Sequence, residues 1–249
     1  MARKKNMGTC HICGTYGELS FEHVPNKAAF NSTTILEYSF EDTFIKKDKS
    51  KGRKIQGGVG QYTLCKKCNN DTGAWYGGEF TRWAHNCMDF LYQRSLYLDF
   101  SDEATVTLLN VYPLRFLKQV VVCFFSVSPN LATEHPELVK FVQDKYEQHI
   151  PNNCRFYMNF FYNTNKTIPL RRMPLAGIIS VQWDGKNIIP TGSSISSEIA
   201  HPPFQLIMSD NYHKKAGDIT PFGNFGYDDQ QNITLRLGVL KGKSALPNT

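Results

Sequence analysis

Two short strands and one helix are predicted by the pattern of apolar and polar residues in the first part of the chain. Apolar runs at residues 19–21 and 62–64 are bounded by polar or turn residues, which is typical of short strands, and residues 33–44 can form a further arm. Large apolar residues then recur at helical spacing, which predicts a helix with one side in the core; they are Trp75, Tyr76, Phe80, Trp83, Met88 and Leu91.

The start of this helix carries two kinds of signal. Residues 69–72, Asn-Asn-Asp-Thr, are of the types that cap a helix N-terminus. Three glycines that follow either weaken the helix or mark a position where another part of the backbone comes close; they are Gly73, Gly77 and Gly78. We therefore expect the helix to be capped within residues 69–72.

The pattern changes between Asp99 and Glu103. Beyond it, an apolar and β-branched run at 105–111 predicts a strand, and two helices are expected at Leu114–Ser128 and Glu137–Gln148. Strands are expected from Arg155 onward, with Asp184-Gly185 as a type I′ hairpin signal. Their ranges are Phe156–Tyr162, Gly177–Trp183, Ile188–Thr191, Glu198–Met208 (broken by Pro202-Pro203) and Ile233–Leu240.

The fold class expected from this pattern is α+β. We place a first domain at residues 1–92 and a second at 93–249, which combines two helices with an antiparallel sheet. The first domain contains a basic, glycine-rich loop at 45–60.

The positive net charge of the chain adds a prediction about its partners. The chain has 249 residues and a net charge of +6, which favours polyanions such as nucleic acid. Part of the charge is concentrated in the 45–60 loop, at Lys46, Lys47, Lys49, Lys51, Arg53 and Lys54. These side chains could follow a phosphate backbone; the alternative is an ordinary solvated loop.

Cysteine usage indicates a reducing compartment. Seven cysteines is an odd number and four of them form metal-type pairs, so a disulfide framework is not expected. No apolar run follows the basic N-terminus, and the longest one, Val120–Phe125, is too short to span a bilayer. We expect a cytoplasmic protein without membrane contact, in which Cys87, Cys123 and Cys154 are core thiols.

Two Cys-x-x-Cys pairs, Cys10/Cys13 and Cys65/Cys68, predict a structural zinc site. His11 could compete as a ligand, but four thiolates already complete a tetrahedral shell. The other histidines have no partner motif and are expected to be structural: His85, His135, His149, His201 and His213.

Candidate chemistry lies within the segment that the zinc would fasten. Glu22-His23 ends a strand before Pro25, and Asn69 directly follows Cys68. A carboxylate, an imidazole and an amide can together hold a hard cation and activate a water molecule. This set predicts a metal-dependent nuclease.

The order of these residues resembles the HNH, or ββα-metal, endonucleases, most closely the endonuclease VII type of Holliday-junction resolvase. In that type an acid-His pair follows the first of two zinc-binding cysteine pairs, and an asparagine directly follows the second, as Glu22-His23 and Asn69 do here. The resemblance covers about the first third of the chain. It implies a ββα-metal domain in which His23 is the general base and Glu22 and Asn69 bind one Mg²⁺ or Mn²⁺.

Some positions depart from the family pattern. The acid is Glu where Asp is commoner, and Gly73 stands where many members have a His or Asn. The loop asparagine of the family could be Asn26 or Asn31, and Asn70 is an alternative to Asn69.

The function expected is cleavage of nucleic acid, with duplex DNA as the expected substrate, as in a restriction or anti-phage effector. Arg82 would join the basic loop in holding phosphates. The second domain would supply specificity, a homodimer contact or a regulatory partner site. The alternative is a non-catalytic zinc module that binds nucleic acid or protein, and a third possibility is a nuclease that stays inactive until a partner binds residues 93–249.

Overall fold

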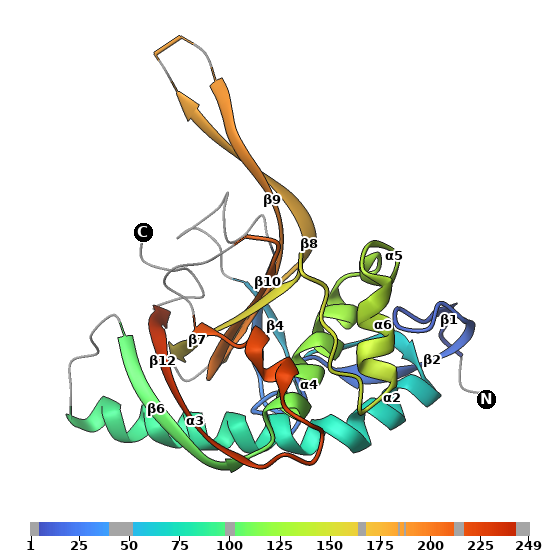
Figure 1. Cartoon of the computed structure of the whole chain (residues 1–249), viewed down its shortest axis with the longest axis horizontal. Coiled ribbons are helices and arrows are strands. Elements are labelled where there is room, and N and C mark those ends of the chain that lie inside the picture. The colour runs from blue at the N-terminus through green and yellow to red at the C-terminus, as the bar shows by residue number, and fades with distance from the viewer. Residues whose placement is uncertain are drawn as a thin grey trace.

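The computed structural model describes residues 5–39, 52–97, 103–163, 168–183, 185–186, 188–211 and 217–242. It contains a small sheet, a large sheet, a group of helices between them and one long helix along an edge of the molecule (Figure 1). The predicted α+β class is therefore confirmed.

The small sheet carries both cysteine pairs at its ends. It has the order β1 (Met7–Thr9), β2 (Tyr16–His23) and β5 (Gly60–Cys65), and every pairing is antiparallel. The two predicted strands are parts of β2 and β5. The register shifts between Ser20 and Phe21, just before the Glu22-His23 pair.

A long helical run follows β5 without a break. It consists of α2 (Lys66–Thr72), the π-helical turn η2 (Gly73–Gly77) and α3 (Gly78–Tyr97). The predicted helix is confirmed, but its predicted cap was wrong. The N-cap is Cys65, whose Sγ accepts a hydrogen bond from the Cys68 backbone N at 3.5 Å. A thiol thus occupies the position where sequence rules favour a hydroxyl, carboxylate or amide side chain.

One of the three glycines does mark a close approach, although to a side chain. A Cβ atom on Gly77 would lie 2.9 Å from Nδ2 of Asn26, which donates to the Gly77 carbonyl at 3.4 Å. The helical run and the loop after β2 are therefore in direct contact at this point.

The large sheet has nine strands within the described residues and is mixed. Its order is β4-β3-β8-β9-β10-β7-β12-β6, and β11 pairs with β7. β8 and β9 extend from it as a long two-stranded ribbon (Figure 1). Its strands are β3 (Ile35–Tyr38), β4 (Arg53–Ile55), β6 (Glu103–Val111), β7 (Arg155–Asn163), β8 (Ile168–Trp183), β9 (Ile188–His201), β10 (Phe204–Ser209), β11 (Gly217–Asp218) and β12 (Gln231–Gly242).

Two features of this sheet differ from the expectation. The predicted antiparallel sheet contains two parallel pairings, β3 with β8 and β7 with β12. Moreover, β3 and β4 come from the segment between the cysteine pairs, yet they form the edge of a sheet whose other strands lie beyond residue 93. Residues 1–92 and 93–249 are therefore joined by backbone hydrogen bonds.

Helix α4 (Pro113–Val127) lies in the centre of the molecule. Nearly all its side chains are buried, as the apolar run predicts. Phe116 stacks on Trp83 of α3 with ring centroids 4.2 Å apart, and Phe124 packs on Phe156 of β7. This helix therefore connects α3 with the large sheet.

Two shorter helices follow, α5 (Leu131–Glu134) and α6 (Pro136–Gln143). α6 ends five residues before the predicted end. The buried Lys118 Nζ donates to backbone carbonyls of Phe141, Asp144 (2.9 Å) and Glu147 (2.6 Å). These bonds satisfy carbonyls at and beyond the C-terminus of α6, so the chain can leave the helix there.

His201 should make the fold sensitive to acid. Its side chain is only 3% exposed, and burial lowers its pKa to about 4 from 6.5. The unfolded chain binds the proton more readily than the folded chain, so protonation of His201 favours unfolding. The free energy of unfolding therefore keeps its full value above pH 6.5 and falls by about 3 kcal/mol as the pH drops toward 4. We expect His201→Phe to lessen the fall in the urea midpoint across this window, relative to wild type; an unchanged pH profile would contradict this assignment.

Candidate metal centre and adjoining cavity

The four paired cysteines form one cluster. Their Sγ atoms all lie within 4.8 Å of one another, and Cys13 and Cys65 are 3.9 Å apart. A tetrahedral zinc ion with Zn–S bonds of about 2.3 Å requires sulfur atoms about 3.8 Å apart. The cluster could therefore bind a metal such as zinc with little rearrangement.

Local geometry explains how each pair reaches the cluster. Cys10 and Cys13 lie in the turn between β1 and β2, where Gly14 has a φ of +70° and donates its N–H to the Cys10 carbonyl at 2.9 Å. Cys65 and Cys68 lie where β5 passes into α2. Hydrogen bonding from Cys68 lowers the pKa of the Cys10 thiol to about 4, while the same hydrogen bond raises the pKa of Cys68 and burial raises that of Cys65. Without a metal the negative charge of the cluster is therefore favoured on Cys10.

His11 does not join this cluster. Its Nδ1 donates to the Phe125 carbonyl of α4 at 2.9 Å. His11 therefore joins the cysteine turn to α4 and is not positioned as a metal ligand. The potential ligands of this cluster are the four thiols.

A cavity of about 230 Å³ lies nearby, and Glu22, His23 and Asn69 all line it. β2 supplies the first two, and α2 supplies the third. Asn26 and Gln119 line the same cavity. Glu22 and Asn69, which are 47 positions apart in the sequence, are thus brought to one site.

Glu22 points toward α4. Its side chain is 8% exposed, and Oε1 accepts hydrogen bonds from the hydroxyls of Thr63 and Ser126, the latter at 2.8 Å. Burial raises the pKa of Glu22 to about 7, although the two hydroxyls act in the opposite direction. Oε2 accepts no hydrogen bond from any residue that the structure describes, which leaves it available to a cation.

His23 is the last residue of β2 and is half-buried. Its Nε2 donates a long hydrogen bond to the Gly57 carbonyl at 3.3 Å, and its ring packs edge-on against Phe21. The adjacent positions 22 and 23 therefore hold one carboxylate that faces the interior and one imidazole nearer to solvent.

Asn69 is held against β2. Its Nδ2 donates to Ser20 Oγ at 3.0 Å and to the Phe21 carbonyl at 3.5 Å. Both bonds use the amide nitrogen, so the amide oxygen is the group that can meet a cation. The alternative residue, Asn70, is exposed and does not line the cavity.

The two loop asparagines have different positions. Asn26 lines the cavity, whereas Asn31 is fully buried and binds Pro25 and Val59 through three hydrogen bonds of 2.7 Å. Asn31 therefore braces the loop after β2, and Asn26 is the loop asparagine that adjoins the candidate site.

Sequence reasoning missed the residues that α4 and β5 add to the site. Thr63 and Ser126 hold Glu22, and Gln119 lines the cavity. A signal did exist, because Gln119 and Ser126 are uncharged polar residues in a mostly apolar helix. The sequence around these two residues, however, does not indicate that Glu22 and the cavity would be their partners.

The basic residues predicted to hold phosphates are only partly described. Lys46, Lys47, Lys49 and Lys51 lie outside the described residues. Arg53 and Lys54 belong to β4, and the Arg53 guanidinium pairs with Glu37 at 2.5 Å. Neither Arg53 nor Lys54 lines the cavity of Glu22 and His23.

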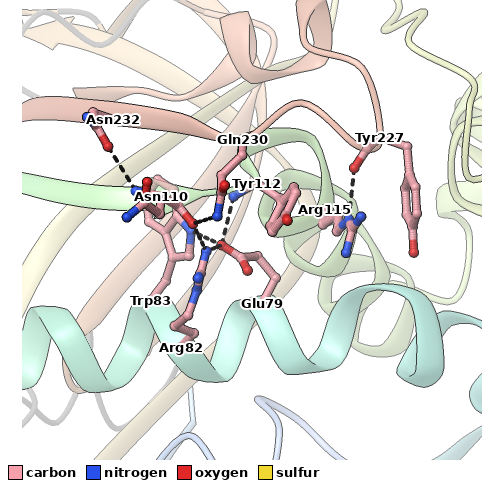
Figure 2. A network of polar contacts seen from close by, with 9 residues as sticks. All are labelled: Glu79, Arg82, Trp83, Asn110, Tyr112, Arg115, Tyr227, Gln230 and Asn232. Atoms are coloured by element: carbon pink, nitrogen blue, oxygen red, sulfur yellow. Dashed lines mark hydrogen bonds and ion pairs between the residues drawn. The ribbon is translucent and has the colours of Figure 1, made fainter.

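Arg82 has a structural environment in a network between α3 and β6 (Figure 2). It pairs with Glu79 at 3.0 Å and donates to the Asn110 carbonyl. Glu79 also accepts from the Trp83 ring nitrogen and the Tyr112 backbone, both at 2.9 Å. Because Arg82 is engaged here and does not line the cavity, its predicted phosphate contact has no support from its position.

The chain matches no protein-family model, no curated protein and no solved structure. Among the described residues, no helix has both the length and the apolar character needed to cross a membrane.

Proposed function

We propose that the protein is a metal-dependent endonuclease of the HNH type that hydrolyses phosphodiester bonds, with duplex DNA as the substrate. The observation that carries this proposal is the cavity that joins Glu22, His23 and Asn69 beside a four-cysteine cluster. The order of elements agrees with it, since two antiparallel strands, β2 and β5, lead directly into α2.

Each residue has a distinct role in this proposal. Glu22 Oε2 and the Asn69 amide oxygen would hold one Mg²⁺ or Mn²⁺, which supplies charge neutralisation at a phosphate oxygen. His23 would accept the proton of the attacking water, as a neutral imidazole can near neutral pH. The zinc site would keep the β1–β2 turn and the start of α2 together, so that these groups retain their spacing.

One observation favours a different function, a non-catalytic zinc module. Glu22 is buried and receives two hydroxyl donors, which is also the environment of a structural carboxyl group. This candidate predicts binding of nucleic acid or protein without cleavage.

Cleavage of supercoiled plasmid tests the proposal. We expect zinc-loaded protein to convert plasmid to nicked or linear DNA when Mg²⁺ or Mn²⁺ is added, and to leave it intact when that ion alone is omitted. Omission is a cleaner control than a chelator, since a chelator would also remove the zinc. A folded, zinc-loaded chain that binds but cuts neither plasmid, branched DNA nor RNA would favour the zinc module or a requirement for a partner.

A further inference from the structure

Gln119 of α4 has an unsatisfied polar atom at the candidate site. Its side chain is 6% exposed, it lines the cavity with Glu22 and Asn69, and Oε1 has no hydrogen-bond partner among the described residues. The amide nitrogen, Nε2, lies 3.9 Å from the Cys123 sulfur, which is a weak contact. A buried oxygen without a partner costs about 1–3 kcal/mol, so its presence needs an explanation.

The surroundings place the Gln119 side chain on the face of α4 that borders the cavity. Gln119, Val122 and Ser126 recur at helical spacing on α4; the first two line the cavity, and the third holds Glu22. Opposite them, a Cβ atom on Gly77 would meet Asn26 Nδ2 at 2.9 Å and Gln119 Oε1 at 3.9 Å. The Gln119 amide and the Asn26 amide therefore converge on one glycine of η2.

We propose that Gln119 Oε1 is a further ligand of the divalent cation, alongside Glu22 and Asn69. This inference rests on the proposed function. Hard cations such as Mg²⁺ and Mn²⁺ prefer oxygen ligands, and a side-chain amide oxygen is one of them. One carboxylate and two neutral amides leave the ion with net positive charge, which suits contact with a phosphodiester. The cation would also satisfy the buried oxygen that the protein itself leaves without a partner.

Manganese binding to the zinc-loaded full chain tests this role without relying on activity. In calorimetric titrations with Mn²⁺, we expect Gln119→Leu to weaken binding at least about tenfold, as expected when a ligand atom is removed. Gln119→Glu, which keeps an oxygen and adds charge, should bind Mn²⁺ at least as tightly as wild type.

Thermal melts separate a ligand from a structural residue. Without Mn²⁺, Gln119→Leu should melt no lower than wild type, because it removes an unsatisfied atom; with Mn²⁺, it should lack most of the rise in Tm that wild type shows. Asn159→Leu is the matched control, since Asn159 is a buried amide in β7 whose Oδ1 also has no partner in the described chain. This control should keep wild-type Mn²⁺ affinity.

Two results would overturn the inference in distinguishable ways. If Gln119→Leu binds Mn²⁺ as wild type does, Gln119 is not a ligand, while the wild-type binding leaves the proposed function intact. If zinc-loaded wild type itself binds no Mn²⁺ or Mg²⁺, both the inference and the catalytic ion of the proposed function fail.

Discussion

Cys68→Ser is expected to lose bound zinc and to unfold the small sheet together with the start of the helical run. Cys68 is buried, and its sulfur belongs to the four-thiol cluster that joins the β1–β2 turn to the β5–α2 junction. Structural zinc contributes about 10–16 kcal/mol in small zinc domains. For a chain of this size, a loss of only about 4 kcal/mol lowers Tm by roughly 10 °C, so the variant should melt far below wild type or aggregate on expression.

Metal analysis together with thermal melts measures this effect. Wild type should hold one zinc per chain and the variant much less. Cys87→Ala is the matched control, because Cys87 is a fully buried thiol of α3 outside the cluster. Its removal should leave the zinc content unchanged and cost about 1 kcal/mol for the cavity. A Cys68→Ser variant with wild-type Tm would show that the cluster does not support the fold.

Local patterns predicted the parts of the fold that depend on neighbours in the sequence. The strands around Leu19 and Leu64 and the helix at residues 113–127 follow from short periodic runs. The cysteine cluster follows from pair spacing, because two cysteines three positions apart can bind one metal ion from a single turn. Each of these signals is complete within a few residues.

Long-range contacts left no such signal. The parallel pairing of β3 with β8 joins residues more than 130 positions apart, and neither strand has a feature that specifies its partner. The same holds for Ser126, which contacts Glu22 from 104 residues away. Arg82 shows that charge alone does not reveal an environment, since the side chain pairs with the neighbouring acid Glu79, and its phosphate contact stays a prediction.

His23→Ala is expected to abolish cleavage while preserving the fold. Loss of a general base reduces the rate by about 10²–10⁴-fold. The substitution removes one long hydrogen bond, from Nε2 to the Gly57 carbonyl at 3.3 Å, at a half-exposed position, so zinc content and Tm should stay close to wild type. Initial rates of plasmid nicking at saturating Mg²⁺ measure the effect, and added imidazole should restore part of the activity.

The matched control is His85→Ala, because His85 also donates from Nε2 to a backbone carbonyl, that of Ala28, yet does not line the cavity. It should cleave as wild type does. Equal rates in wild type and His23→Ala would exclude His23 as the base. A catalytic imidazole and one that only packs give different results. For a catalytic role, cleavage is lost in His23→Ala, retained in His85→Ala and recovered with imidazole, whereas a structural role predicts no rescue by a free base.

DNA affinity adds an independent criterion. Because the base is not needed for phosphate contacts, His23→Ala should bind duplex DNA as tightly as wild type.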